Sequence, residues 1–111
     1  MSDDEKQTRD DFADAVNMTA SEMKRWLGTD ESKAVGQKPS GGGESTGHES
    51  GRHIVRILEK KQGEYTDDDY AHMRKVVGYV ARHSKQEPSG DIHDTKWRWS
   101  LMNWGHDPEK R

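Results

Sequence analysis

Apolar residues recur at helical spacing in separate stretches of the chain, with polar or turn-forming residues between them. Residues 3–16 predict a charged helix that has few apolar positions. In the next stretch, Met23, Trp26 and Leu27 fall at positions i, i+3 and i+4, the spacing of one buried helix face. Residues 30–35 suit one further turn. The first third of the chain is therefore predicted to be helical.

The residues around this second stretch are typical of helix ends. Thr19 and Glu22 form a T-x-x-E capping box, in which each side chain satisfies a backbone N–H that the helix leaves without a partner. Gly28 suits the left-handed backbone position that often follows a helix. These signals predict a short helix between Thr19 and Gly28.

Two more helices are predicted in the middle of the chain, after a loop at 36–50 that is rich in Gly and Ser. The first runs from about residue 52 to 62, and Gly63 ends it. Thr66 caps the second, a long helix whose three opening aspartates favour the positive end of the helix dipole. Its apolar positions are Tyr70, Met73, Val76, Val77, Val80 and Ala81.

The last apolar stretch, residues 94–105, fits two kinds of element. As a helix it would place Trp97, Leu101 and Trp104 on one face, and as a strand it would align Trp97, Trp99 and Leu101. A capping residue at 94 or 95, a glycine at the far end and the presence of Leu and Met favour the helix. We therefore expect a final helix in this stretch.

Together these patterns predict an all-α fold, a small bundle of four to five helices. Its centre would be a helix-turn-helix-like pair that follows a flexible, glycine-rich loop. Residues 1–9 are expected to form a flexible acidic end, residues 10–108 a single helical domain that includes the loop at 36–50, and residues 109–111 a short tail.

The amino-acid composition indicates what kind of core this fold has. Only 28% of the 111 residues are hydrophobic, but the net charge is just -3, and four Trp and three Tyr can each bury a large area. We expect a thin core reinforced by aromatic rings. The absence of cysteine excludes disulfides and thiol chemistry. The start of the chain does not resemble a signal peptide, and no apolar run is long enough to span a bilayer, so we expect a soluble, cytoplasmic protein.

Charge is distributed unevenly along the chain. Residues 1–32 carry nine acids and four bases, whereas residues 52–85 carry eight bases and five acids. Basic and polar residues recur at helical spacing on both central helices, which suits contacts with DNA phosphates and base readout from the longer helix. An ordinary solvated surface would give the same pattern. The candidate nucleic-acid-binding residues are Arg52, Arg56, Lys60, Lys75, Tyr79, Arg82 and Gln86.

The loop before the central pair raises the question of an anion site. A Walker loop needs Lys followed by Ser or Thr after its last glycine, and here Gly51 precedes Arg52 and His53. Ser50 could instead cap the following helix, with Arg52 in its first turn. Ser50, Gly51 and Arg52 are therefore a candidate contact for a single phosphate, and residues 41–46 are read as a connector.

Metal and catalytic sites are not predicted. His48, Glu49 and His53 give H-E-x-x-x-H, one residue longer than the zincin motif, which rotates the second imidazole by about 100° around a helix. His72 and His83 would share a helix face but lack a third ligand in the sequence around them. We therefore expect a non-enzymatic protein without metal or cofactor.

A second functional hypothesis concerns the last helix. If Trp97 and Leu101 face the core, Trp99 and Met102 turn outward on the opposite side. An exposed Trp and Met suit a surface for a protein partner or for self-association, as in a stress-related structural module.

Four blocks, NMTASEMKRWLGTDESKAVGQ, GHESGRHIVRIL, HMRKVVGYVARH and KWRWSLMNWGHDP, resemble a family of small bacterial and fungal proteins of unknown function, whose members are often labelled DNA-binding protein. The resemblance covers roughly residues 10–108 and includes the stretch from Gly47 to Arg52. It implies DNA as a partner and provides no catalytic residues.

Overall fold

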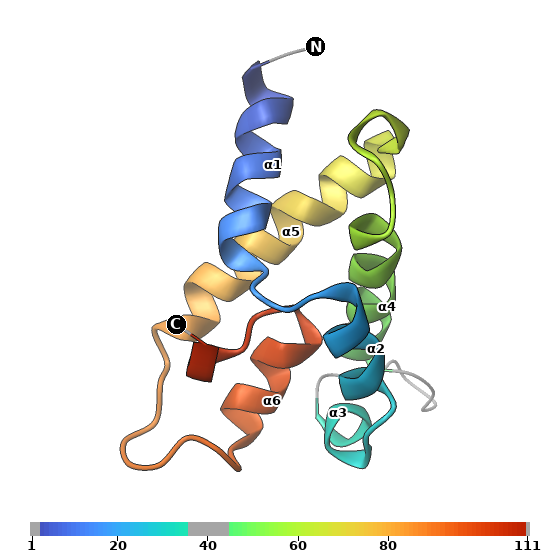
Figure 1. The fold of residues 1–111 in the computed structure, drawn as a ribbon. Helices are drawn as coiled ribbons and strands as arrows, with labels where there is room; N and C mark the ends of the chain where they lie inside the picture. Colours follow the sequence, from blue (N-terminus) through green and yellow to red (C-terminus); the bar gives the residue numbers. More distant parts are fainter. Residues whose placement is uncertain (1–2, 36–44, 111) are drawn as a thin grey trace.

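The computed structural model describes residues 3–35 and 45–110, and these residues are helical, with no strand among them (Figure 1). This confirms the all-α class. The elements are α1 (Asp3–Ala15), α2 (Ala20–Leu27), α3 (Asp30–Ala34), α4 (Thr46–Leu58), the 3-10 turn η1 (Gln62–Glu64), α5 (Asp67–Ser84), α6 (Lys96–Asn103) and the 3-10 turn η2 (Pro108–Lys110).

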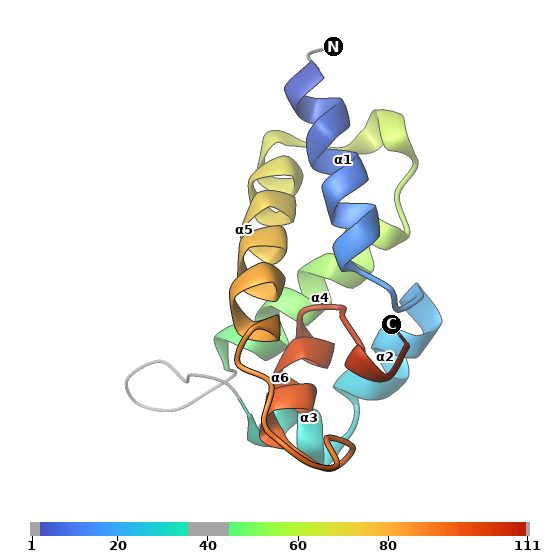
Figure 2. The same cartoon turned by 90° about the vertical axis from the view of Figure 1, so that its left-hand side faces the viewer.

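The helices pack around the central pair. Helix α1 lies along α5, and α2 lies against α4 (Figures 1 and 2). Helices α4 and α5 diverge from η1, and α6 contacts both of them as well as α2 and α3. The start of α4, the middle of α5 and the end of α6 thereby surround one region of the surface.

The core is small and draws on every long helix. Met23, Ile54, Ile57, Met73 and Leu101 are almost completely buried. Trp97 and Trp104 join them, at 8% and 5% exposure. Aromatic rings thus reinforce a core of aliphatic side chains, as the composition predicted, and methionines add to it.

Most of the predicted caps are present. Thr19 and Glu22 form the expected capping box, and the hydroxyl of Thr66 accepts from the backbone N–H of Asp69 at the start of α5. Thr95 caps α6, which confirms the helix over the strand, and Gly105 follows it with a φ of 83°. The left-handed backbone conformation predicted for Gly28 is wrong. Its φ is -82°, because the chain turns directly into Thr29, the cap of α3.

The predicted limits of α4 are also wrong. The helix begins at Thr46, with Ser45 as its cap, and ends at Leu58, so the predicted span 52–62 is shifted at both ends. Gly63 lies in η1 and does not end the helix. Of the predicted connector, residues 41–44 fall outside the described residues, whereas Ser45 and Thr46 start the helix.

Residues near both ends of the described chain take part in the fold. Helix α1 runs unbroken across the boundary expected at residue 10; Thr8 is buried, and Arg9 Nη1 donates to the hydroxyl of Tyr70 at 2.9 Å. At the other end, Lys110 Nζ donates to Oε1 of Glu22 at 2.6 Å. Among the described helices, none has the length and apolarity to cross a membrane.

Candidate functional site

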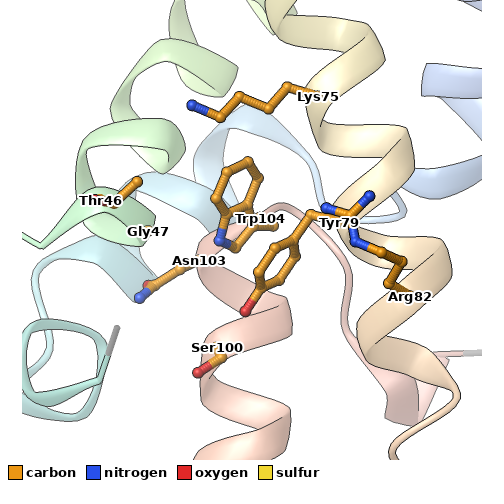
Figure 3. A pocket seen from close by; sticks show the side chains of 8 residues that line it. All are labelled: Thr46, Gly47, Lys75, Tyr79, Arg82, Ser100, Asn103 and Trp104. Atoms are coloured by element: carbon orange, nitrogen blue, oxygen red, sulfur yellow. The ribbon is translucent and has the colours of Figure 1, made fainter. Parts of the chain in front are cut away.

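Two adjoining cavities open on the face where α4, α5 and α6 meet. The larger has a volume of about 300 Å³ and the smaller about 160 Å³, and Thr46 and Lys75 line both. Figure 3 shows how the larger cavity draws side chains from the start of α4, the middle of α5 and the end of α6. Its lining residues are Thr46, Gly47, Lys75, Tyr79, Arg82, Ser100, Asn103 and Trp104.

Three of the predicted basic residues come together at these cavities. Arg56 lines the smaller cavity, Arg82 the larger, and Lys75 both. All three are exposed, and within the described chain none of them forms a hydrogen bond or an ion pair. Among the described residues, Glu49 is the only acid that lines either cavity, and it lies at the smaller one. This face therefore carries positive charge that no acid in the described part of the chain neutralises through an ion pair.

A column of stacked rings backs the cavities. The ring centroids of Tyr79 and Trp104 are 4.3 Å apart, and those of His53 and His72 are also 4.3 Å apart. His72 stacks on Trp104, and His83 stacks on Tyr79. Because Tyr79 is stacked on both sides, its ring cannot stack on a nucleic-acid base without displacing a neighbour. Burial raises the pKa of Tyr79, so its hydroxyl stays protonated.

The other predicted basic and polar residues lie elsewhere. Arg52 lines a separate groove with Lys24 and His48. Lys60 Nζ is 2.5 Å from Oδ2 of Asp69, so its charge is used inside the fold. Gln86 follows the end of α5 and does not line either cavity. The predicted stripe on α4 is thus divided between three surroundings, since its members point in different directions once the neighbouring helices are in place.

Asp69 is a buried acid whose role the sequence reasoning missed. Only 4% of its side chain is exposed, and it binds Lys60 and the imidazole of His53, 2.9 Å away. Burial favours the neutral acid, but hydrogen bonds from Lys60, the backbone of Thr66 and His53 outweigh it and hold the pKa of Asp69 far below its usual range. The T-x-x-D spacing from Thr66 was the available signal, because it forms a capping box.

The phosphate contact predicted at Ser50, Gly51 and Arg52 was argued from a helix start, and the structure places that start at Thr46 instead. Ser50 and Gly51 lie in the interior of α4 and are buried, so they are not a helix start. The hydroxyl of Ser50 is 2.8 Å from Nε2 of His72. Burial, followed by the charges of His53 and Lys75, lowers the pKa of His72 to about 4. The hydroxyl of Ser50 is thus paired with the imidazole of His72, and both residues line the smaller cavity.

The outward orientation predicted for Met102 is wrong, because its side chain is 8% exposed and belongs to the core. Helix α6 contacts four other helices, so side chains on opposite faces are covered. Trp99, the other predicted partner residue, is partly exposed. The described residues contain no group of three or more His, Asp or Glu placed to hold a metal ion.

Comparison with known proteins gives one match. The profile of a family described as "Protein of unknown function (DUF3140)" matches residues 11–102, most of the chain. No curated protein and no solved structure matches the chain. On the strength of the family match, the chain belongs to the DUF3140 family of proteins of unknown function.

Proposed function

We propose that this chain is a small, non-enzymatic DNA-binding protein that contacts backbone phosphates through the basic face between α4 and α5. One observation carries the proposal: Arg56, Lys75 and Arg82 line two adjoining cavities, and within the described residues they have no ionic partner. A cation without an ionic partner can bind a DNA phosphate and release counterions that are condensed on the DNA.

The arrangement of the helices supports the same proposal. The chain passes from α4 through the short η1 into the long α5, which is the order of a helix-turn-helix pair. Arg82 lies near the end of α5 and is exposed, so it could contact either a phosphate or a base edge. Gln86, beyond the end of the helix, is the second residue for base contacts.

The acidic first helix does not neutralise this face. Asp11 and Asp14 of α1 line a different cavity, with Val77 and Val80 of α5. Within the described chain, no ion pair joins an acid of α1 to Arg56, Lys75 or Arg82. The net charge of -3 therefore says little about this local surface.

Fluorescence anisotropy with labelled duplex and single-stranded DNA tests the proposal. Binding at low salt should weaken steeply as salt rises, and Arg56→Gln, Lys75→Gln and Arg82→Gln should each reduce the salt slope by about 1. Arg74→Gln is the matched control, since Arg74 is exposed next to Lys75 but lines neither cavity. Absence of binding at low salt, or an equal effect of the control, would contradict the proposal.

A second candidate function is a protein-interaction or stress-related module that uses Trp99. It is favoured by one observation: Trp99 stays partly exposed on α6, whereas Trp97 and Trp104 on the same segment are buried. Sedimentation analysis of the wild type and Trp99→Ala tests it. A concentration-dependent oligomer that Trp99→Ala dissociates would support this function, and a monomer at every concentration would count against self-association.

A further inference from the structure

The wall of the larger cavity contains an indole N–H that has no partner among the described residues and is not itself buried. Trp104 is 5% exposed and lines the cavity. The indole N–H of Trp26 donates to Asn103 and that of Trp97 to the backbone of His83, but that of Trp104 makes no hydrogen bond within the described residues. Figure 3 shows the Trp104 nitrogen turned toward Gly47. The rest of the side chain is buried, so the cavity is where this donor can meet a ligand or a water molecule.

The start of α4 supplies further donors at the same place. The hydroxyl of Ser45 accepts from the backbone N–H of His48, which leaves the N–H groups of Thr46 and Gly47 without a partner inside the helix. The positive end of the helix dipole adds to their attraction for an anion. A Cβ on Gly47 would lie 3.3 Å from Nε1 of Trp104, so the glycine keeps the indole N–H accessible from the helix end.

The remaining wall adds positive charge. Lys75 and Arg82 reach the cavity from α5, and none of the described residues that line it is acidic. Asn103 also lines it, but its Oδ1 already accepts hydrogen bonds from Trp26 and Ser32. The cavity therefore presents donors from a helix end, an indole, an ammonium and a guanidinium group, and the described residues place no carboxylate in its lining.

We propose that this cavity is a binding site for a phosphate monoester, with the phosphate held by the Thr46 and Gly47 backbone N–H groups, Trp104 Nε1, Lys75 and Arg82. Donors on several sides suit a tetrahedral oxyanion with several acceptor oxygens better than a flat carboxylate. The volume of about 300 Å³ is at the lower limit of small-molecule sites, which leaves room for an organic group beside the phosphate. The site goes beyond the proposed contact with internal DNA phosphates and does not depend on it.

Amide and indole NMR spectra of the full chain provide a direct test. Inorganic phosphate, ribose 5-phosphate and ribose would each be titrated into the ¹⁵N-labelled protein. The Trp104 indole and Gly47 amide signals should shift and saturate with the two phosphates and stay unchanged with ribose. Absence of a saturable shift at Trp104 with every phosphate probe would overturn the proposal.

Two variants separate this site from general charge attraction. Lys75→Gln should weaken binding of ribose 5-phosphate by about tenfold, since it removes a charged donor, whereas Arg74→Gln should change it less than about twofold. Gly47→Ala places a methyl group beside the Trp104 N–H and should weaken binding by about tenfold or more. Because alanine also favours the helix, retained thermal stability in this variant shows that the loss is local. Equal weakening by Lys75→Gln and Arg74→Gln would contradict the site.

A second pair of probes distinguishes the source of the phosphate. A short oligonucleotide with a 5′-phosphate is compared with the same oligonucleotide ending in a 5′-hydroxyl. A Trp104 shift that requires the 5′-phosphate, without a shift from ribose 5-phosphate, would assign the site to a nucleic-acid end; a shift with ribose 5-phosphate would assign it to a free monoester. Either result supports the site. Failure of duplex binding in the anisotropy titrations would contradict only the proposed DNA-binding function.

Discussion

Gly51 lies so close to the main chain of Asn103 that a Cβ at this position would be 2.8 Å from the Asn103 carbonyl oxygen. The same Cβ would be 2.6 Å from Cδ2 of Leu27. Helices α4 and α6 therefore meet nearly backbone to backbone, and Leu27 of α2 packs against the same position. This approach brings the start of α4 close to Trp104 and so shapes the larger cavity.

The first prediction concerns this contact. Gly51→Ala should lower the free energy of unfolding by about 1–3 kcal/mol, because the added methyl group forces the helices apart. The helix propensity of alanine works in the opposite direction by about 1 kcal/mol. Urea denaturation measures the difference, with Gly63→Ala as control, since nothing lies within 4 Å of a Cβ there. A Gly51→Ala protein as stable as the wild type would show that the helices are not in close contact.

The second prediction concerns Asn103, which is 1% exposed. Its Oδ1 accepts from Trp26 Nε1 at 2.8 Å and its Nδ2 donates to the backbone oxygen of Ser32 at 3.0 Å. Asn103→Ala leaves several buried polar groups unpaired and should cost about 2–4 kcal/mol in thermal or urea denaturation. Trp26→Phe removes only one of these hydrogen bonds and should have the smaller effect. A larger loss of stability in Trp26→Phe than in Asn103→Ala would contradict this description of the contact between α2, α3 and α6.

The third prediction follows from the pKa of His72. This pKa is about 4 in the folded chain and near 6.5 when unfolded. Between these values the unfolded chain binds a proton that the folded chain does not, so stability should fall as pH drops from about 6.5 toward 4. His72→Gln does not titrate and should show a shallower loss in thermal melts over this range.

His93 provides an internal check on this experiment. The hydrogen bond to Glu109 raises the pKa of His93. The stability that His93 contributes is therefore present at low pH and is lost as pH rises through the pKa of the folded chain. That trend is opposite to the one from His72 and is the same in both proteins, so it cancels in the difference between them. Parallel pH profiles for the wild type and His72→Gln would show that His72 does not titrate as described.

The fourth prediction separates two kinds of cation. Lys60 binds the buried Asp69, whereas Lys75 lines both cavities without a partner in the described chain. Lys60→Gln should lower the free energy of unfolding by about 1–3 kcal/mol, because the acid loses a charged hydrogen-bond donor. Lys75→Gln should leave stability nearly unchanged and weaken DNA binding more than Lys60→Gln does. Urea denaturation measures stability, and anisotropy at one salt concentration measures DNA binding. The prediction would be refuted if Lys75→Gln lowered stability more and Lys60→Gln weakened DNA binding more.

Local features of the sequence were sufficient to predict most of the fold. The periodic apolar positions identified the helices, and the caps at Thr19, Thr66 and Thr95 set three of their starts. Capping depends on side chains and backbone groups a few residues apart, and periodicity depends on one helix face, so both can be read without knowing the neighbours. The end of α6 at Gly105 was predicted from a local signal as well, because glycine readily adopts the positive φ found there.

Packing decided what local signals could not. Residues 46–51 are helical although two glycines lower their helix propensity. Packing against α6 holds this segment in place, and the approach is so close that a side chain at Gly51 would clash. Met102 is buried because α6 contacts helices on more than one side. The sequence by itself determined which segments are helices and that α4 and α5 carry basic residues. Only the tertiary structure decided that Arg56, Lys75 and Arg82 share one face while Lys60 binds Asp69, since those relationships join residues from helices whose relative placement depends on long-range packing.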